Sequence, residues 1–361
     1  MRAAVLTAAR APLAIADVTV SKPLAHEVLI RTAAVGVCRS DLHFVDGLYP
    51  HTLPAIPGHE AAGVVEAVGS EVRTVRPGDH VVTCLSAFCG HCEFCLSGRM
   101  SLCVSGETRR PRGAEPRLRL ADGGAVAQML NLSAYAEQML VHEHACVAID
   151  RDMPLDRAAL IGCAVTTGAG AVFNTADVAP GETVCVVGCG GIGLAAVNAA
   201  RIAGAGRIVA LDPVPEKRAL AERLGATDTF DSAAEGVAAA VVEATRGGVH
   251  HAIEAVGRPQ SAATAVAVLR RGGTATILGM LPPAESVGLS ALDLLSGKKL
   301  QGGLMGSNRF PIDVPRLVDF YRRGLLDLDT LIAERLPLER INHAFDELRR
   351  GDSTRSVIVF A

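Results

Sequence analysis

A glycine-rich turn between an apolar run and a helical stretch is the feature that most constrains the fold of this chain. The run covers residues 183–187 (TVCVV), and an Ala-rich stretch of helical character continues to Ala203. Between them GCGGIG matches G-x-G-x-x-G, with the turn residues Gly188, Gly190, Gly191, Ile192 and Gly193. Such glycines let a pyrophosphate approach the backbone at a helix N-terminus. The pattern is weak alone, but after a strand and before a helix it predicts a dinucleotide-binding turn.

Strand and helix signals continue to alternate beyond this turn. Further apolar runs occur at 207–211, 252–256 and 273–278. Alternating β and α units form parallel sheets with helices on both faces, so we predict an α/β fold with a doubly wound sheet. Asp212 ends the second of these strands. A carboxylate there accepts hydrogen bonds from ribose hydroxyls and repels a 2′-phosphate, which favours NAD over NADP.

The N-terminal part of the chain has a different pattern. Short Val- and Ile-rich runs, such as 27–31 and 63–69, are interrupted by Gly and Pro and predict an irregular β-rich domain. Residues 109–125 carry Gly and Arg without periodicity, so we predict a surface loop there.

The C-terminal part returns to helical periodicity. Residues 314–321 and 341–349 predict amphipathic helices, and 356–360 a closing strand. We expect a cofactor domain over 165–304. That residues 305–361 join residues 1–164 in a second domain is implied by the resemblance to a known family described below.

Four cysteines within one turn-rich segment predict a metal site. Their spacing is C-x2-C-x2-C-x7-C, and they are Cys89, Cys92, Cys95 and Cys103. Four thiolates close the tetrahedral coordination of a zinc ion and leave no position for water, so this zinc would be structural. An iron–sulfur cluster, or four unrelated buried thiols, are the alternatives.

Charge and cysteine content bound the partners and the compartment. The formal net charge of −3 argues against nucleic acid or an anionic membrane as a partner. We expect no apolar run long enough to cross a bilayer, and residues 1–7 predict a strand rather than a signal peptide. The chain is thus expected to be cytoplasmic, where its ten cysteines would serve metal binding or catalysis before disulfides.

Three scattered residues form a second candidate metal site: Cys38, His59 and Cys163. Two thiolates and one imidazole with an open fourth position suit a catalytic zinc. Spacing alone does not join these residues, and each read singly is more often a packed cysteine or a hydrogen-bonded histidine.

The chain resembles the medium-chain zinc alcohol dehydrogenases. The segments that carry the resemblance occur in the family's order and are GVCRSDLH (36–43), GHEAAG (58–63), the four-cysteine segment, GCAVTTG (162–168) and GCGGIG (188–193). The resemblance runs from the first strand to RSVIV at 355–359 and covers essentially the whole chain. It implies a GroES-like β domain, a Rossmann domain, a catalytic zinc on Cys38, His59 and Cys163, and hydride transfer between an alcohol and NAD.

The resemblance also implies roles for four residues around the catalytic zinc. The hydroxyl of Ser40 would hydrogen-bond the substrate oxygen, and His43 would be the terminal proton acceptor. Asp41 would orient the imidazole of His59, as carboxylates do for metal-bound histidines. Glu60, next to a ligand, would approach the zinc during ligand exchange. A surface histidine at position 43 and purely structural ion pairs at 41 and 60 are the alternatives.

Further cofactor contacts follow from the same resemblance. Arg39 and Arg355 match pyrophosphate contacts, for which guanidinium groups are suited, although either could be an ordinary surface arginine. Lys217 matches a position near the adenosine ribose, and Thr167 one that packs against the nicotinamide. Cys189 is expected to be a small filler of the turn.

The substrate is the part that the sequence reveals least. By family placement, Tyr49, Leu85 and residues 129–132 would line an apolar pocket for a primary or aryl alcohol or aldehyde; plain core packing is the alternative. Arginines between 109 and 117 could instead mark a carboxylate-bearing thiol adduct, as in the formaldehyde-oxidising branch. A catalytically inactive NAD-binding protein is a further alternative. Cys163 speaks against quinone reductases, which lack both zincs, and against polyol enzymes, which usually have a carboxylate there.

The length of one segment bears on assembly. The segment 104–130 is long, as it is in the dimeric branch of the family. We therefore predict a homodimer joined through edge strands near 295–306.

Overall fold

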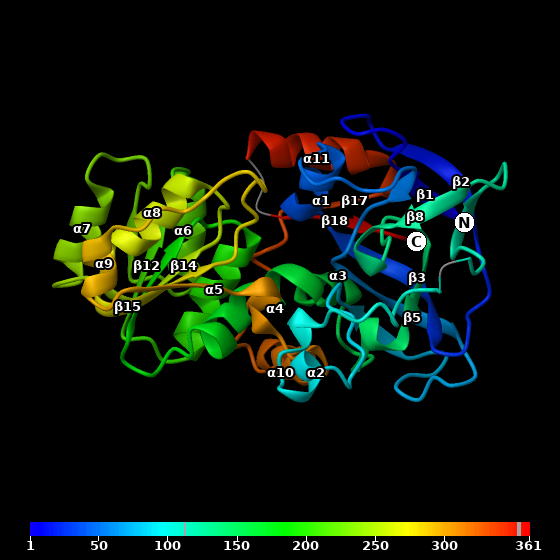
Figure 1. Ribbon diagram of the computed structural model, residues 1–361, viewed down its shortest axis with the longest axis horizontal. Coiled ribbons are helices and arrows are strands. Elements are labelled where there is room, and N and C mark those ends of the chain that lie inside the picture. Colours follow the sequence, from blue (N-terminus) through cyan, green and yellow to red (C-terminus); the bar gives the residue numbers. More distant parts are fainter. Residues whose placement is uncertain (112, 352–354) are drawn as a thin grey trace. The chain divides into compact units, whose positions relative to one another are not determined.

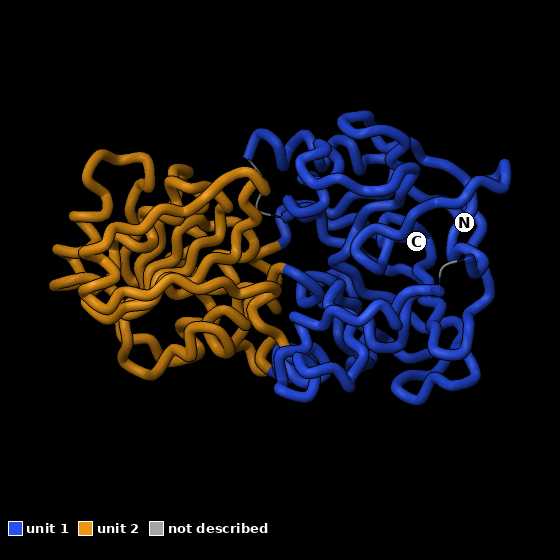
Figure 2. Tube along the Cα trace, viewed as in Figure 1, with its two compact units in different colours: residues 1–163, 309–319, 332–361 blue, residues 164–308, 320–331 orange. Residues whose placement is uncertain are grey.

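The computed structural model describes residues 1–111, 113–351 and 355–361. The chain forms two compact units, traced in Figure 1 and coloured separately in Figure 2. Unit 1 comprises residues 1–163, 309–319 and 332–361, and unit 2 comprises 164–308 and 320–331. The domain limits predicted after residues 164 and 304 stay predictions.

Unit 2 contains the parallel sheet that the alternating pattern predicts. Its strands, in spatial order, are β13 (Asp228–Phe230), β12 (Arg207–Leu211), β11 (Thr183–Val187), β14 (Val249–Glu254), β15 (Leu269–Ile277) and β16 (Lys299–Gly302). All neighbouring pairs are parallel. Numbered within the unit, the order is 3-2-1-4-5-6, which is that of Rossmann dinucleotide-binding folds.

The central strand and the helix after it show why this sequence packs as it does. Val184, Val186 and Val187 of β11 are buried, as expected for a strand covered on both faces. The helix that follows β11 is α5 (Gly191–Ile202). It buries several alanines, whose small side chains let the helix lie close to the strands. The remaining helices of this unit are α4 (Thr166–Gly170), α6 (Pro215–Leu224), α7 (Val237–Ala244), α8 (Pro259–Ala267) and α9 (Ala291–Leu295).

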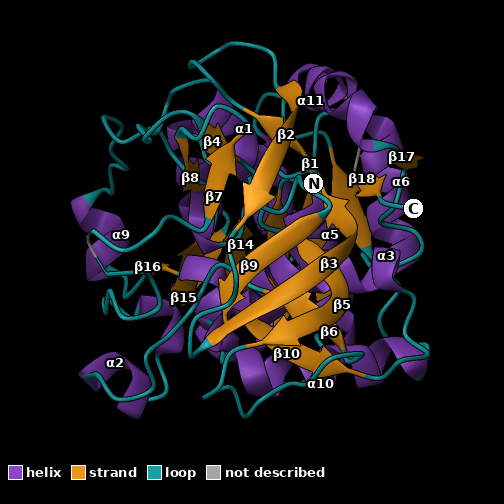
Figure 3. Cartoon of the chain, turned by 90° about the vertical axis from the view of Figure 1, so that its right-hand side faces the viewer, coloured by secondary structure: helices purple, strands orange, loops and turns teal. Residues whose placement is uncertain are grey.

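Unit 1 is built from two mostly antiparallel sheets. The smaller has the order β1 (Arg2–Val5), β2 (Ala14–Val20), β7 (Leu118–Leu120), β8 (Ala125–Gln128) and β4 (Ala55–Ile56). The larger, prominent in Figure 3, has the order β10 (Cys146–Ile149), β6 (His80–Thr83), β5 (Ala61–Val68), β3 (Glu27–Gly36), β18 (Ser356–Val359) and β17 (Glu334–Leu336), with β9 (Gln138–His142) also paired to β3.

Unit 1 also contains several α-helices, and the first and last of them contribute Leu42 and Phe345 to its aliphatic core. They are α1 (Arg39–Val45), α2 (Glu93–Leu96), α3 (Leu155–Leu160), α10 (Phe310–Arg322, whose last turn belongs to unit 2) and α11 (Ile341–Arg350). The edge-to-face pair Tyr135 and Phe345, with ring centroids 5.9 Å apart, lies fully buried within that core.

The loop predicted over residues 109–125 is wrong in part, because the segment contains β7 and the start of β8. Arg117, just before β7, is buried and donates from Nε to Glu27 Oε1 at 2.7 Å. Arg110 donates from Nε to the same oxygen at 2.9 Å. A strand of three residues is too short to show a period. The sequence also does not indicate that Arg110 and Arg117, which precede the strand, have a buried partner.

The expectation of no membrane-length apolar run is also corrected. Residues Leu155–Thr175 form 21 residues of continuous helix with a mean hydropathy of 1.3 over their most apolar part. Of that part 83% is buried inside the protein, as in the core helix of a globular domain. The stretch includes two π-helical segments, Ile161–Val165 and Ala171–Thr175.

Candidate metal centres and cofactor turn

Three elements of unit 1 bring Cys38, His59 and Cys163 together. Cys38 precedes α1, His59 precedes β5, and Cys163 lies in a π-helical segment, a feature frequent at functional sites. All three are buried, and their ligating atoms lie within 4.8 Å of one another. The Sγ atoms of the two cysteines are 4.0 Å apart, close to the roughly 3.8 Å that tetrahedral zinc requires. This donor set fits a zinc ion with one position left for another ligand.

The imidazole of His59 is held in place by a hydrogen bond to Asp41. Its Nδ1 donates to Asp41 Oδ1 at 2.8 Å, so Nε2 is left without a proton and faces Cys163 Sγ at 3.1 Å. Asp41 also accepts from the backbone N–H of Gly58 at 3.1 Å and from the hydroxyl of Tyr135 at 3.0 Å. Tyr135 is a site residue that sequence reasoning missed, because it stands in an apolar stretch that reads as core.

Glu60 and Arg355 form a buried pair beside the same ligands. Arg355 Nη1 lies 3.4 Å from Glu60 Oε2 and donates to the carbonyl of Val37 at 2.9 Å. Neither carboxylate oxygen of Glu60 has a hydrogen-bond partner among the described residues. Burial raises the pKa of Glu60 to about 8, against the opposing effect of Arg355. Arg355 is therefore no surface arginine, although its predicted contact with a pyrophosphate remains a prediction.

The electrostatics of the centre suit a cation. The hydrogen bond with Cys163 holds the pKa of Cys38 well below its usual range against the effect of burial, and the positive charge of Arg355 acts in the same direction as the hydrogen bond. A thiolate at Cys38 is the form that binds metal.

Ser40 and His43 lie three residues apart on α1, a spacing that makes them neighbours on a helix surface. His43 is half-buried, and burial, together with the charge of Arg39, lowers its pKa. Its Nδ1 has no hydrogen-bond partner within the described part of the chain, and its ring lies parallel to that of Tyr49 at 6.2 Å. Arg39 donates from Nη2 to the carbonyl of Leu348 at 2.7 Å.

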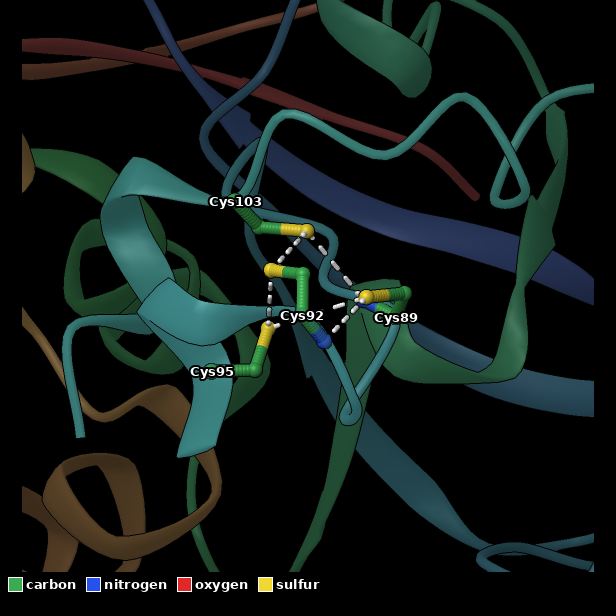
Figure 4. Close-up of side chains that lie close together, drawn as sticks. All are labelled: Cys89, Cys92, Cys95 and Cys103. Carbon is green, nitrogen blue, oxygen red and sulfur yellow. Dashed lines mark hydrogen bonds between the residues drawn. The ribbon is translucent and has the colours of Figure 1, made fainter. Parts of the chain in front are cut away.

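The four-cysteine segment gathers its sulfurs around one point (Figure 4). Cys92 Sγ lies 3.5 Å from Cys95 Sγ and 3.8 Å from Cys103 Sγ, and the sulfurs of Cys89 and Cys95 are 3.9 Å apart. These separations match the roughly 3.8 Å of a single tetrahedral zinc and are too short for four ligands spread around an iron–sulfur cluster. The backbone N–H groups of Cys89 and Cys92 point at the sulfurs of Cys103 and Cys89, each at 3.3 Å.

In unit 2 the glycines of the predicted cofactor turn have distinct tasks. Gly188 directly follows β11 and has a φ of +96°. Gly190 precedes α5, and a Cβ added to it would meet no atom of the chain within 4 Å. A Cβ at Gly193 would lie 1.7 Å from the carbonyl oxygen of Gly188, so the helix can start only with glycine there. Gly191 and Ile192 form the first turn of α5.

Asp212 braces this turn. Its Oδ2 accepts from the N–H of Cys189 at 2.8 Å, and its Oδ1 accepts from the N–H of Val214 at 3.0 Å. Lys217 lies in the first turns of α6. Thr167, on α4, is buried within unit 2 and its hydroxyl faces Met305 Sδ at 3.6 Å.

Comparisons with known proteins agree with these features. Residues 24–151 match the alcohol dehydrogenase GroES-like domain family, and residues 191–322 match the zinc-binding dehydrogenase family. An alcohol dehydrogenase zinc-binding domain protein from Burkholderia ambifaria is 35% identical, with 100% of this chain and 98% of that chain covered and a TM-score of 0.95. Benzyl alcohol dehydrogenase from Acinetobacter calcoaceticus is 32% identical, with 100% and 99% covered and a TM-score of 0.92.

A third similar structure was determined with a cofactor. It is a zinc-binding dehydrogenase from Sinorhizobium meliloti 1021 bound to NADP, 27% identical, with 99% of each chain covered and a TM-score of 0.83. Together with the two groups of metal-ligating residues, these matches confirm the predicted fold class and family. The chain is a zinc-dependent oxidoreductase that uses a nicotinamide cofactor, and it belongs to the medium-chain zinc-dependent alcohol dehydrogenase family.

Proposed function

We propose that this protein transfers a hydride between a primary or aryl alcohol and NAD, with the aldehyde or ketone as the other partner of the reaction. The observation that carries the proposal is the buried set Cys38, His59 and Cys163, whose three ligating atoms converge and leave a fourth position for substrate. The intact set also disfavours an inactive NAD-binding protein.

The residues around that position supply binding and proton transfer. When bound, a zinc ion acts as a Lewis acid and lowers the pKa of an alcohol hydroxyl towards neutrality. The hydroxyl of Ser40 takes the substrate's proton as it releases its own, and His43 is the terminal acceptor, since its lowered pKa keeps the imidazole neutral. Asp41 keeps His59 in the tautomer that leaves Nε2 free.

Asp212 supports NAD as the cofactor. Its negative charge stands where a ribose 2′-phosphate would approach, at the end of β12 and against the glycine turn. We expect kcat/KM to be higher with NAD than with NADP, and Asp212→Ser to narrow that preference at least tenfold. The similar Sinorhizobium protein was determined with NADP bound, so both cofactors should be measured. A wild-type preference for NADP would overturn this part of the proposal.

An aryl or primary alcohol is favoured over a thiol adduct. One similar protein is a benzyl alcohol dehydrogenase, and Leu85 and Leu130 are partly buried apolar candidates for the pocket wall. Of the predicted lining, Met129 and Leu132 are fully buried in the core of unit 1.

The arginines that would recognise a thiol adduct form hydrogen bonds within the protein instead. Arg110 and Arg117 are both bound to Glu27. Arg109 donates to Asn131 at 3.3 Å, and Arg112 lies outside the described residues.

Metal content and turnover together test the proposal. The purified protein should carry about two zinc ions per chain and reduce NAD with benzyl alcohol or short primary alcohols faster than with polyols or thiol adducts. Cys38→Ser should leave one zinc, abolish turnover and spare the fold as judged by circular dichroism. Full activity in that variant, or initial rates that favour a thiol adduct, would refute the respective assignment.

We further propose a cytoplasmic homodimer with only small molecules as substrates and no nucleic-acid or membrane partner. Leu292, Leu294 and Leu295 of α9 are exposed, and β16 is an edge strand that a second copy could extend. Leu292→Glu combined with Leu295→Glu should convert a dimer into a monomer in light scattering after gel filtration. A monomeric wild-type protein would contradict the dimer.

A further inference from the structure

A pocket of about 340 Å³ lies in unit 2 at the amino ends of its central strands. Thr183 from the start of β11, the loop 245–248 after α7, His250 from β14 and two arginines from β15 line it. Figure 1 labels α7, β14 and β15. The glycine turn follows the carboxyl end of β11, a strand of five residues or roughly 16 Å, so the pocket and the cofactor turn lie at opposite ends of one strand.

The pocket is strongly basic. Arg246, Arg270 and Arg271 all line it, and none of them forms an ion pair with a carboxylate among the residues that the structure describes. Glu182, the acidic neighbour of Thr183 in sequence, is bound to His251 Nε2 at 2.8 Å. Since the whole chain carries a formal charge of −3, this concentration of positive charge is local.

His250 positions one of the arginines that line the pocket. His250 Nδ1 faces the N–H of Thr183 at 3.1 Å, and its Nε2 faces Arg270 Nη1 at 2.7 Å. Burial, with the charge of Arg270, lowers the pKa of His250, which keeps the ring neutral with a single acceptor nitrogen. The hydroxyl of Thr183 lies 2.8 Å from Nδ1 and accepts its hydrogen, so Nε2 is the acceptor for Arg270. The ring thus holds the guanidinium of Arg270 at the pocket.

The loop that carries Arg246 has an unusual backbone. Arg246, Gly247 and Gly248 have φ values of +55°, +120° and +103°. Positive φ is uncommon for a residue other than glycine, and such strain recurs at ligand sites. Gly248 is pressed against β15, since a Cβ there would lie 2.5 Å from the backbone nitrogen of Arg270. The loop is thus held where Arg246 shares a pocket with the arginines of β15.

We propose that this pocket binds a small molecule that carries a phosphoryl group. Guanidinium groups match phosphate oxygens with paired N–H donors, and three of them converge on one pocket. The pocket volume is at the small end of the range for small-molecule sites. Its lining has no aromatic ring other than His250, so the ligand is a phosphate ester with a compact polar body rather than a nucleotide base stacked on the protein.

Calorimetric titration of the zinc-loaded full chain with pyrophosphate and with inorganic phosphate tests this site. Ionic strength is held constant with KCl, and each titration is repeated with saturating NAD, which occupies the glycine turn. We expect one site per chain that survives saturation with NAD. Arg270→Gln combined with Arg271→Gln should weaken it at least tenfold, and the double lysine variant, which keeps the charge but loses the paired donors, should weaken it less.

The matched control is Arg223→Gln, an exposed arginine of unit 2 that does not line the pocket. It should leave phosphate binding within twofold of the wild type. Loss of binding on NAD saturation, an equal loss in the control variant, or tighter binding of citrate than of either phosphate would each overturn the proposal. NAD affinity is measured on every variant, so that failure of the cofactor proposal is distinguished from failure of this site.

Discussion

His59 donates its Nδ1 hydrogen to Asp41 Oδ1 across 2.8 Å, and both side chains are completely buried. The contact fixes the tautomer and the orientation of the imidazole, so that Nε2 faces the thiolates. Asp41 is itself held by Gly58 and Tyr135, which makes the carboxylate a rigid support rather than a mobile counter-charge.

Replacement of Tyr135 by Phe should loosen the metal centre without unfolding the protein. The change removes the hydroxyl that donates to Asp41 Oδ2 at 3.0 Å and keeps the ring that packs on Phe345. We expect a loss of about 1–3 kcal/mol in the free energy of unfolding, because a buried carboxylate oxygen loses its donor. Zinc release to a chromogenic chelator should be about three- to tenfold faster, since partners of metal-bound histidines tune affinity.

Tyr321→Phe is the control for this change, because it removes an exposed hydroxyl contact to Asp329 at 3.2 Å. Zinc release should be unaffected there. If Tyr135→Phe lowers stability but releases zinc at the wild-type rate, Tyr135 serves packing alone.

Two glycines of the cofactor turn should respond differently to the same substitution. Gly193→Ala places a Cβ 1.7 Å from the carbonyl oxygen of Gly188, so we expect about 2–4 kcal/mol of destabilisation or failure to fold. Gly190→Ala meets nothing within 4 Å in the chain itself, so the protein should fold and lose at least tenfold in NAD affinity. Urea unfolding and cofactor titration separate the two effects; equal behaviour of both variants would count against this division of roles.

Glu27 should make stability depend on acid pH. Burial by itself raises its pKa, but hydrogen bonds from Arg110, the N–H of Leu24 and Arg117 lower it to about 2, from 4.5 in the unfolded chain. Because the unfolded state then takes up the proton first, the stabilisation is full above about pH 5 and is lost as pH falls towards 2.

Glu27→Gln should therefore destabilise the protein by about 3–5 kcal/mol at pH 7, since it leaves two buried guanidinium groups without their counter-charge. The gap to the wild type in urea unfolding should shrink between pH 5 and pH 3, and loss of zinc in acid affects both proteins alike. A gap that stays constant with pH would show that the carboxylate is not ionised in the folded protein.

Cys95→Ser should remove the structural zinc and leave the catalytic one. It deletes one of four thiolates whose sulfurs lie as close as 3.5 Å, and a site that lacks one ligand binds zinc far more weakly. We expect about one zinc per chain by mass spectrometry and a lower melting temperature. Cys146→Ser, at a buried thiol outside both metal groups, should keep both ions. Two zinc ions in the Cys95 variant would contradict the closed four-cysteine site.

Several strand boundaries could be predicted, because local pattern carries them. The run at 183–187 became β11 with the predicted limits, and 207–211 became β12. The strand predicted at 252–256 instead begins at Val249, since His250 and His251 occupy strand positions by binding Thr183 and Glu182. A strand that contains polar residues with hydrogen-bond partners elsewhere in the chain cannot be predicted from a pattern of apolar residues alone.

By itself the sequence determined the α/β class, the glycine turn and the four-cysteine segment, because each depends on residues a few positions apart. The tertiary structure alone decided which distant groups meet. Cys38 and Cys163 are 125 positions apart, Tyr135 and Asp41 are 94, and Arg117 and Glu27 are 90. Such contacts depend on how strands pair and helices pack. No local spacing in the sequence predicts such contacts. The resemblance to a family therefore implied the zinc ligands, but it did not reveal the hydrogen bond by which Tyr135 holds Asp41.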